Sequence, residues 1–215
     1  TIMKEQAFNN VTLIEHPILS RDLSLLRDKS SSTVKFRKVL QRIATILAYH
    51  ALEHLPTTTY SIETPVKDTV GYALKTDVVV VPILRAGLTL VDAILEFIPD
   101  ARVGHLGMYR DEETLEPVDY YANIPDGIEN ALTLVVDPML ATGGSADDAI
   151  SYLKKENASE ILFISLISAP EGLTHLEKHH PDVSVITSAI DSHLNDQGFI
   201  VPGLGDAGDR YFGTL

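Results

Sequence analysis

The sequence predicts an α/β protein in which helices cover both faces of a doubly wound parallel sheet. Short apolar runs rich in Val and Ile alternate along the chain with segments whose apolar residues recur every three or four positions. The apolar runs are nearly continuous, which is typical of strands buried on both faces of a parallel sheet. Some runs end in small-residue turns that lead directly into helical segments. In such sheets, ligands bind at the carboxyl ends of the strands.

The first part of the chain is expected to form helices and a two-stranded arm outside the sheet. Helical spacing covers residues 16–29 and 33–55. Ser32 and Thr33 are candidate N-caps of the second helix, because their hydroxyls can accept a hydrogen bond from a backbone N–H. Residues 58–63 alternate in polarity and end before Pro65, which favours an edge strand or arm with residues 71–75 as its partner.

The middle of the chain carries the predicted sheet. The predicted strands are residues 77–82, 101–109, 132–136, 161–168 and 183–189. The predicted helices are residues 88–98, 144–155 and 170–178. Residues 111–130 are acidic, contain two prolines and are interpreted as a long loop that could cover a site.

The glycine-rich residues 190–215 are expected to be irregular, and the block 200–210 is expected to be neither helix nor strand. We interpret residues 1–215 as one domain. It would consist of an N-terminal part to about residue 75, a ligand-binding core over about 76–189, and a C-terminal hood.

The composition excludes several classes of protein. The net charge of −13 argues against general nucleic-acid binding, which needs a basic field. The absence of cysteine excludes disulfides and thiolate chemistry. No apolar stretch approaches the ~20 residues of a membrane span, and residues 1–6 lack the pattern of a signal peptide. We therefore expect no membrane partner and a cytoplasmic location, or an organellar one if a leader has been removed.

Residues 132–145 form the most informative segment. A predicted strand ends at Asp137, and the small residues 141–145 then open a helix. Backbone N–H groups of such a turn bind anions, and the helix N-terminus adds a partial positive charge. A purely structural turn with Ser145 as N-cap is the alternative. Asp137 favours a sugar-phosphate site, because a carboxylate there can accept hydrogen bonds from ribose hydroxyls.

The same turn differs from two common phosphate-binding motifs, since neither a Walker P-loop nor a Rossmann fingerprint is present. Thr142 and Ser145 can donate hydrogen bonds to phosphate oxygens. Gly144 is expected to adopt a positive φ that a β-branched residue would resist.

Two arginines lie at other predicted strand ends. Arg85, beside Ala86 and Gly87, fits an anion site and a capped turn with a solvated arginine equally well. Arg110 ends the predicted strand 101–109, where a ligand role competes with a surface ion pair to the acids that follow. The glycine-rich block farther along, residues 200–210, offers bare backbone N–H and C=O groups that can read a flat heterocycle.

These segments together resemble one family. The turn after Asp137 resembles the phosphoribosyl-diphosphate (PRPP) loop of type I phosphoribosyltransferases, in which two adjacent acids usually precede Thr-Gly-Gly. Pro138 replaces the second acid, a departure typical of uracil phosphoribosyltransferases. Residues 81–88 resemble the family's pyrophosphate loop and residues 108–117 its flexible cover. Residues 200–210 resemble its uracil-binding segment, which other phosphoribosyltransferases lack.

The resemblance implies that uracil and PRPP react to give uridine 5′-monophosphate (UMP) and diphosphate. The implied catalytic residues are Asp137, Arg85, Arg110 and Asp206. The implied PRPP-binding residues are Arg85, Ala86, Gly87, Arg110, Asp137, Pro138, Met139, Leu140, Ala141, Thr142, Gly143, Gly144, Ser145 and Asp206. The implied uracil-binding residues are Ile200, Gly205, Asp206 and Ala207. Mg²⁺ is expected to arrive with PRPP and without direct protein ligands. A homo-oligomer, dimer or tetramer, and a GTP or CTP effector are also implied.

Other interpretations stay open at this point. A regulatory RNA-binding protein on the same fold is one rival, which the acidic charge disfavours, and a purine or orotate phosphoribosyltransferase is another. Two histidine pairs, His50 with His54 and His175 with His179, have the one-turn spacing that can bind zinc. No third ligand is evident for either pair, so we expect solvated or core-edge histidines.

Overall fold

A parallel sheet forms the centre of the computed structural model, which describes residues 8–110 and 117–214. The strand order is β1-β11-β10-β8-β4-β5, and β9 adds to β10. The strands are β1 (Val11–Leu13), β4 (Asp77–Pro82), β5 (Arg102–Val103), β8 (Ala131–Val136), β9 (Met139–Leu140), β10 (Glu160–Ser168) and β11 (Ser184–Ile190). All their pairings are parallel, which confirms the predicted fold class.

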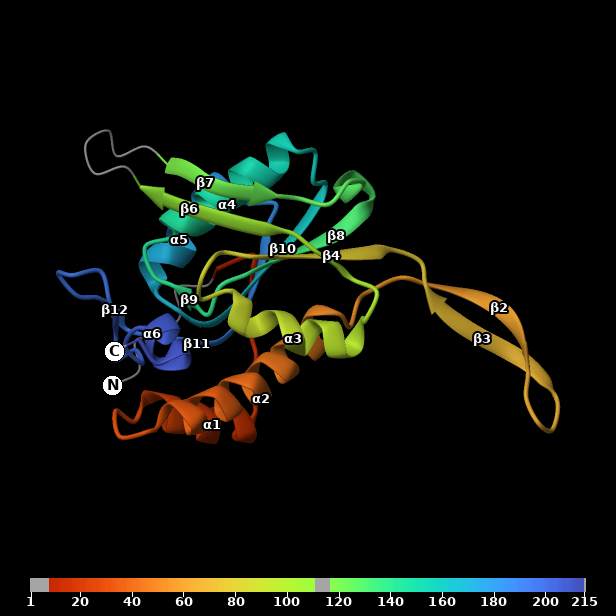
Figure 1. Cartoon of the computed structure of the whole chain (residues 1–215), viewed down its shortest axis with the longest axis horizontal. Helices are drawn as coiled ribbons and strands as arrows, with labels where there is room; N and C mark the ends of the chain where they lie inside the picture. Colours follow the sequence, from red (N-terminus) through yellow and green to blue (C-terminus); the bar gives the residue numbers. More distant parts are fainter. Residues whose placement is uncertain (1–7, 111–116, 215) are drawn as a thin grey trace.

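Helices cover both faces of this sheet (Figure 1). They are α1 (Pro17–Arg27), α2 (Thr33–Ala51), α3 (Leu88–Phe97), α4 (Gly144–Lys155) and α5 (Pro170–His179). Successive strand residues point to opposite faces, so Val78 and Val80 pack in the cluster of α1, α2 and α3. Val79 and Val81 pack in the cluster of α4 and α5. Burial on both faces explains why the strands read as continuous apolar runs.

Local signals set the starts of the N-terminal helices. Ser32 caps α2 by accepting a hydrogen bond from the Lys35 N–H at 3.3 Å, as predicted. His16 caps α1, whose first residue is a proline. Both helices end earlier than predicted, at Arg27 and Ala51.

The predicted arm is a hairpin of β2 (Thr57–Glu63) and β3 (Asp68–Leu74), paired antiparallel. It projects away from the rest of the molecule (Figure 1). Its exposed apolar side chains include Tyr60, Val66, Val70 and Tyr72.

The prediction of one long loop over residues 111–130 is wrong for residues 117–130, the part that the structure describes. The strand β7 (Pro117–Asn123) pairs antiparallel with β6 (His105–Arg110), and a 3₁₀ helix, η1 (Ile128–Asn130), follows. Val and Tyr have high β-propensity, and the partner strand satisfies their backbone groups despite the acidic surroundings. The predicted strand 101–109 is divided at Gly104 between β5 in the main sheet and β6 in this hairpin.

The C-terminal segment also contains more regular structure than expected. Two short strands, β12 (His193–Leu194) and β13 (Ile200–Val201), pair antiparallel, and a helix, α6 (Ala207–Phe212), follows. The expectation that residues 200–210 contain no helix or strand is therefore wrong. Asp206 caps α6 by accepting from the Asp209 N–H at 2.8 Å, and Gly213 ends it with a φ of 76°. Within the described ranges, no helix has the length and apolar character that a membrane span requires.

Candidate active site

A pocket of about 230 Å³ lies at the carboxyl edge of the sheet. Its lining comes from three segments that are far apart in the chain: the loop before α3, the loops after β8, and the C-terminal hood. The lining residues are Ala86, Asp137, Met139, Ala141, Gly198, Phe199, Ile200, Gly205, Asp206, Ala207 and Gly208. The structure thus brings together the three junctions that the sequence singled out.

The loop before α3 is packed tightly against the end of β8. A Cβ atom at Gly87 would lie 2.3 Å from the Val136 carbonyl oxygen, so a side chain at this position has no room. The Leu84–Arg85 peptide bond is cis. The Arg85 side chain is 59% exposed and pairs with Asp209 at 3.2 Å across the pocket rim. This guanidinium is therefore accessible to an anionic ligand.

Asp137 directly follows β8 and lines the pocket. Its carboxyl group is largely removed from water, and this desolvation raises its pKa to about 7. A hydrogen bond from the Met139 N–H at 3.4 Å opposes the shift, while the charge of Asp206 adds to it. Burial therefore favours the neutral form of the Asp137 carboxyl in the free protein.

The turn of residues 141–145, the phosphate cradle, leads into α4. Gly143 is the N-cap residue, with a φ of 87°, and no side chain caps the helix there. The positive φ is therefore at Gly143 and not at Gly144, where it was predicted, and Ser145 is not the N-cap. Thr142 and Ser145 are exposed. The Gly144 N–H donates to Thr142 Oγ1 at 3.3 Å. The next N–H groups of α4, at Ser145 and Ala146, have no partner within the helix, as is usual for a first helical turn, and are available to an anion.

Two of the residues that the family resemblance assigns to PRPP binding, Pro138 and Leu140, have buried side chains. Leu140 is 1% exposed and packs in the core beneath α4. Pro138 is buried, and its carbonyl accepts from the N–H groups of Leu166 and Ile167. These two residues hold the loop on β10, while Met139 between them faces the pocket.

The base segment, residues 200–208, forms the opposite wall. Ile200, Gly205, Asp206 and Ala207 all line the pocket. The chain turns sharply here, since Gly203 has a φ of 61° and a Cβ atom at this position would lie 2.1 Å from the Ile200 carbonyl oxygen. Several backbone groups of this segment therefore face one small cavity.

Side chains from distant parts of the chain hold the base segment in place. Arg27 makes a bidentate pair with Asp191 at 2.6 and 2.7 Å and donates to the Gly203 carbonyl at 2.8 Å. Asp191 also accepts from the Gly203 N–H at 2.9 Å. Arg210 donates to the carbonyls of Leu204 and Leu26. Sequence reasoning missed these braces, because a lone arginine or aspartate carries no local signal of its partner.

Arg110 and the predicted cover over the diphosphate lie at or beyond the end of a described range. Arg110 is the last residue of β6, where its backbone pairs with Pro117. Residues 111–116, which were expected to cover the diphosphate, lie outside the described residues, as does the Arg110 side chain.

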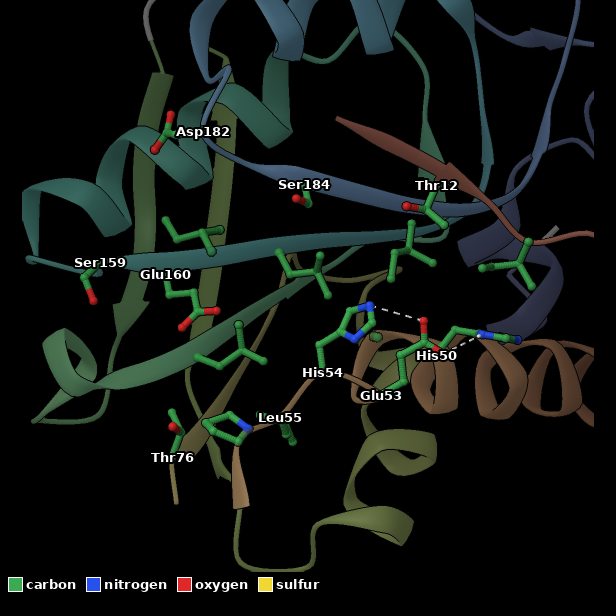
Figure 2. A pocket seen from close by; sticks show the side chains of 17 residues that line it. Thr12, His50, Glu53, His54, Leu55, Thr76, Ser159, Glu160, Asp182 and Ser184 are labelled. Atoms are coloured by element: carbon green, nitrogen blue, oxygen red, sulfur yellow. Dashed lines mark ion pairs between the residues drawn. The ribbon is translucent and has the colours of Figure 1, made fainter. Parts of the chain in front are cut away.

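A second cavity, of about 390 Å³, lies at the opposite, amino edge of the sheet (Figure 2). Its lining includes the acids Glu53, Glu160 and Asp182, and no lysine or arginine among the described residues. Although it is larger, it lacks the cradle and the strand-end carboxylate, and its charge is unfavourable for phosphates. The smaller pocket is therefore the candidate active site.

Comparison with known proteins identifies the family of this chain. A family model described as uracil phosphoribosyltransferase matches residues 13–214. Proteins named uracil phosphoribosyltransferase from Salinibacter ruber and Dictyoglomus thermophilum are 54% and 49% identical, each over 95% of this chain and 98–99% of theirs.

Solved structures show the same fold. A protein of Aquifex aeolicus is 35% identical over 94% of this chain and 97% of its own, with a TM-score of 0.87. A hypoxanthine-guanine phosphoribosyltransferase from Bacillus anthracis, 13% identical over 74% of this chain and 80% of its own, has a TM-score of 0.51 and shows the fold alone.

Proposed function

The chain belongs to the uracil phosphoribosyltransferase family, and from this premise we propose how its residues act in the transfer. The reaction moves the phosphoribosyl group of PRPP to uracil and gives UMP and diphosphate. The observation that carries the assignment of roles is the pocket lined by Asp137, by Ala141 at the start of the phosphate cradle, and by the base segment.

PRPP binding is proposed to use the cradle and the two strand-end arginines. The 5′-phosphate lies on the first N–H groups of α4 and on the hydroxyls of Thr142 and Ser145. Arg85, which is exposed at the pocket rim, and Arg110, which ends β6, bind the diphosphate through charge-assisted hydrogen bonds. Asp137 accepts hydrogen bonds from the ribose hydroxyls.

The same contacts account for catalysis without a covalent nucleophile. As the bond from the anomeric carbon to diphosphate breaks, positive charge develops on the sugar and negative charge on the leaving group. The ionised Asp137 carboxylate stabilises the former, and Arg85 and Arg110 stabilise the latter. Holding the base and the sugar in one pocket removes the entropic cost of their encounter.

The base is proposed to be read mainly by backbone groups. The first N–H groups of α6, at Ala207 and Gly208, have no partner within the helix. Together with backbone groups of Ile200 and Gly205, they can meet the N3–H donor and O4 acceptor of uracil. Asp206, which faces Asp137 across the pocket, lies between the base segment and PRPP and is proposed to contact both.

The pocket also fits a magnesium ion carried by PRPP. Burial raises the pKa of Asp137, and repulsion from the Asp206 carboxylate adds to this rise. A dication would relieve that repulsion. Since Pro138 replaces a second adjacent acid, we propose that phosphate oxygens and water hold Mg²⁺, with these carboxylates outside its first shell. When bound, Mg²⁺ neutralises charge on the diphosphate.

Incubation with PRPP, Mg²⁺ and each base in turn tests the substrate. Cytosine reverses the donor and acceptor pattern of uracil, and fixed backbone groups cannot rotate to suit it. Two mismatched buried pairs at ~1–3 kcal/mol each predict a preference for uracil of roughly 10²-fold to 10⁴-fold in kcat/KM. Comparable rates with both bases would contradict backbone readout of the base. Nucleotide formed from a purine or from orotate would instead reopen the choice of substrate.

An RNA-binding role is the rival from another class, and the net charge of −13 disfavours it. Filter binding at low salt is expected to retain no RNA. Retention that decreases with added salt would revive this rival.

We further propose that the protein is one domain that assembles as a dimer or tetramer. One core cluster joins residues of α1 and α2 with the sheet and the base segment. The exposed apolar arm is suited to contact a second copy, and light scattering after size-exclusion chromatography measures the resulting mass.

GTP or CTP as an effector, and a cytoplasmic compartment, are proposed on the family resemblance alone. Rates with and without each nucleotide test the effector.

A further inference from the structure

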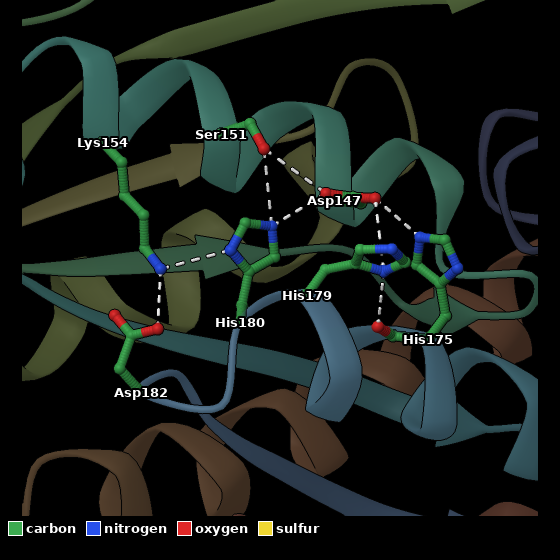
Figure 3. Close-up of polar contacts among 7 residues, drawn as sticks. All are labelled: Asp147, Ser151, Lys154, His175, His179, His180 and Asp182. Atoms are coloured by element: carbon green, nitrogen blue, oxygen red, sulfur yellow. Dashed lines mark hydrogen bonds and ion pairs between the residues drawn. The ribbon is translucent and has the colours of Figure 1, made fainter.

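A cluster of histidines joins α4 to α5 beside the phosphate cradle (Figure 3). His175 Nε2 lies 2.6 Å from Asp147 Oδ2, and His179 Nδ1 lies 3.8 Å from the same oxygen. Among the described residues, this is the one group of three such side chains whose ligand atoms all lie within 4.8 Å of one another. The sequence showed the one-turn spacing of the two histidines, and the fold supplies the carboxylate between them.

A second layer of side chains fixes the orientation of Asp147. The buried His180 contacts Oδ1 through Nε2 at 2.8 Å, and Ser151 donates to the same oxygen at 3.3 Å. Lys154 in turn lies 3.2 Å from His180 Nδ1 and 2.7 Å from Asp182. Because Oδ1 is occupied in this way, Oδ2 is the oxygen presented to the two exposed histidines. Ligating groups in metal sites are commonly oriented by such outer-shell partners.

His175 and His179 are arranged so that both rings can face the Asp147 oxygen. His175 and His179 lie one turn apart at the end of α5, with ring centroids 4.2 Å apart. In the metal-free protein the His179 Nδ1–H donates to the His175 carbonyl at 2.9 Å. Transfer of this proton to Nε2, the other tautomer, would free the Nδ1 lone pair, which lies 3.8 Å from Asp147 Oδ2, for a metal. Their side chains are 34% and 41% exposed, so an ion from solvent can reach them.

We propose that Asp147, His175 and His179 form a binding site for a divalent transition-metal ion that favours imidazole, with Zn²⁺ as the representative. Two imidazoles and one carboxylate are a common set of three ligands for Zn²⁺, with water in the fourth position. Bonds of ~2.0–2.1 Å in a tetrahedron separate ligand atoms by about 3.3 Å. The carboxylate and His175 would therefore part by less than ~1 Å. Mg²⁺ and Ca²⁺ are excluded by their preference for oxygen.

The site is distinct from the proposed PRPP–Mg²⁺ site but lies directly behind the cradle. The Asp147 N–H donates to the Gly143 carbonyl at 2.8 Å. A Cβ atom at Gly143 would lie 3.0 Å from the His175 Cβ, so α5 is in contact with the turn. A bound ion would link the first turn of α4 to the last turns of α5.

Calorimetric titration of the chelator-treated protein with Zn²⁺, without PRPP, tests the site. One Zn²⁺ per chain is expected, and a large excess of Mg²⁺ should not displace it. His179→Ala removes an exposed ligand, and we expect a loss in affinity beyond the ~10–100-fold typical of an outer-shell partner. The same variant should keep the melting temperature of the metal-free protein. Co²⁺ added in place of Zn²⁺ should give visible absorption bands that vanish in this variant.

The other histidine pair provides a matched control. His50 and His54 have the same spacing in sequence, but α2 ends at Ala51, and both contact Glu53 instead of converging on one oxygen. The double variant His50→Ala, His54→Ala should bind Zn²⁺ like the unaltered protein. Equal Zn²⁺ affinity in the His179→Ala variant, or a loss confined to the control, would overturn the proposal, as would the absence of stoichiometric binding.

Discussion

The phosphate cradle, residues 141–145, and the base segment, residues 200–208, both contain glycines and both contribute to one pocket, the cradle through Ala141, but different forces shape them. The cradle is formed locally, because its N–H groups belong to the start of α4. The base segment is held from outside by the Arg27–Asp191 pair and by Arg210. The proposed anion site is thus built from five consecutive residues, whereas the proposed site for a flat base needs partners far away in the chain.

The largest expected effect comes from breaking the cradle at its one positive φ. In Gly143→Val, the new side chain would meet His175 and the Gly172 carbonyl in a conformation that β-branched residues resist. Strain and overpacking of ~1–3 kcal/mol each predict PRPP binding weakened by roughly 10²-fold to 10⁴-fold. Calorimetric titration with PRPP measures this change.

Gly213→Ala is the control for that variant, because Gly213 has a φ of 76° but only Thr33 atoms at 3.8 Å or more near its Cβ position. It should bind PRPP normally. Normal PRPP affinity in Gly143→Val would show that PRPP binding does not depend on the conformation of residues 141–145.

Asp137→Asn should separate catalysis from binding within the pocket. The amide keeps the size of the side chain but lacks the charge that a cationic transition state needs. Loss of such a group predicts a kcat reduced ~10²-fold, with a smaller change in the KM for PRPP. Steady-state kinetics decide the matter, since an unchanged kcat with a raised KM would assign Asp137 to binding alone.

Arg27→Ala tests whether the base segment depends on its braces. Asp191 would be left buried without its bidentate partner, and the turn at Gly203 would lose a donor. We expect the KM for uracil to rise ~10-fold while the KM for PRPP changes little, because the cradle is shaped independently. A lowered melting temperature should accompany it, since breaking a buried pair is destabilising.

Arg37→Ala is the matched control. Arg37 also donates to the C-terminal helix, at the Tyr211 carbonyl, but touches no pocket residue. Equal rises in both KM values for Arg27→Ala would mean that the cradle and the base segment are not independent.

The smallest expected effect is a dependence of activity on pH that comes from the titration of Asp137. Burial raises the pKa of Asp137 to about 7, and the ionised form is the active one, so activity should fall as pH decreases through this value. The ionised fraction predicts kcat/KM roughly fivefold lower at pH 6 than at pH 7. The Asp137→Asn variant should lose this dependence, and an identical profile in the variant would assign the titration to another group.

Much of the fold follows from patterns within single segments. The buried strands β4, β8, β10 and β11 and the helix α4 were predicted to within one or two residues, because continuous apolar runs and helical spacing are local properties. Residues 11–13 were missed, since a strand of three residues forms only where β11 offers a parallel partner. The helix α6 was missed because the cap at Asp206 and the stop at Gly213 outweigh a glycine-rich composition.

The sequence by itself determined the chemistry of the site: the strand-end acid, the glycine turn at a helix start and the base segment are each visible as short motifs. Only the tertiary structure decided what holds them. Arg27 meets Asp191 across 164 residues, and Asp147 meets His175 across 28. Residues near in sequence share one local conformation, which a pattern can reveal. Which distant side chains meet is fixed by how helices pack on the sheet, and no short motif encodes that.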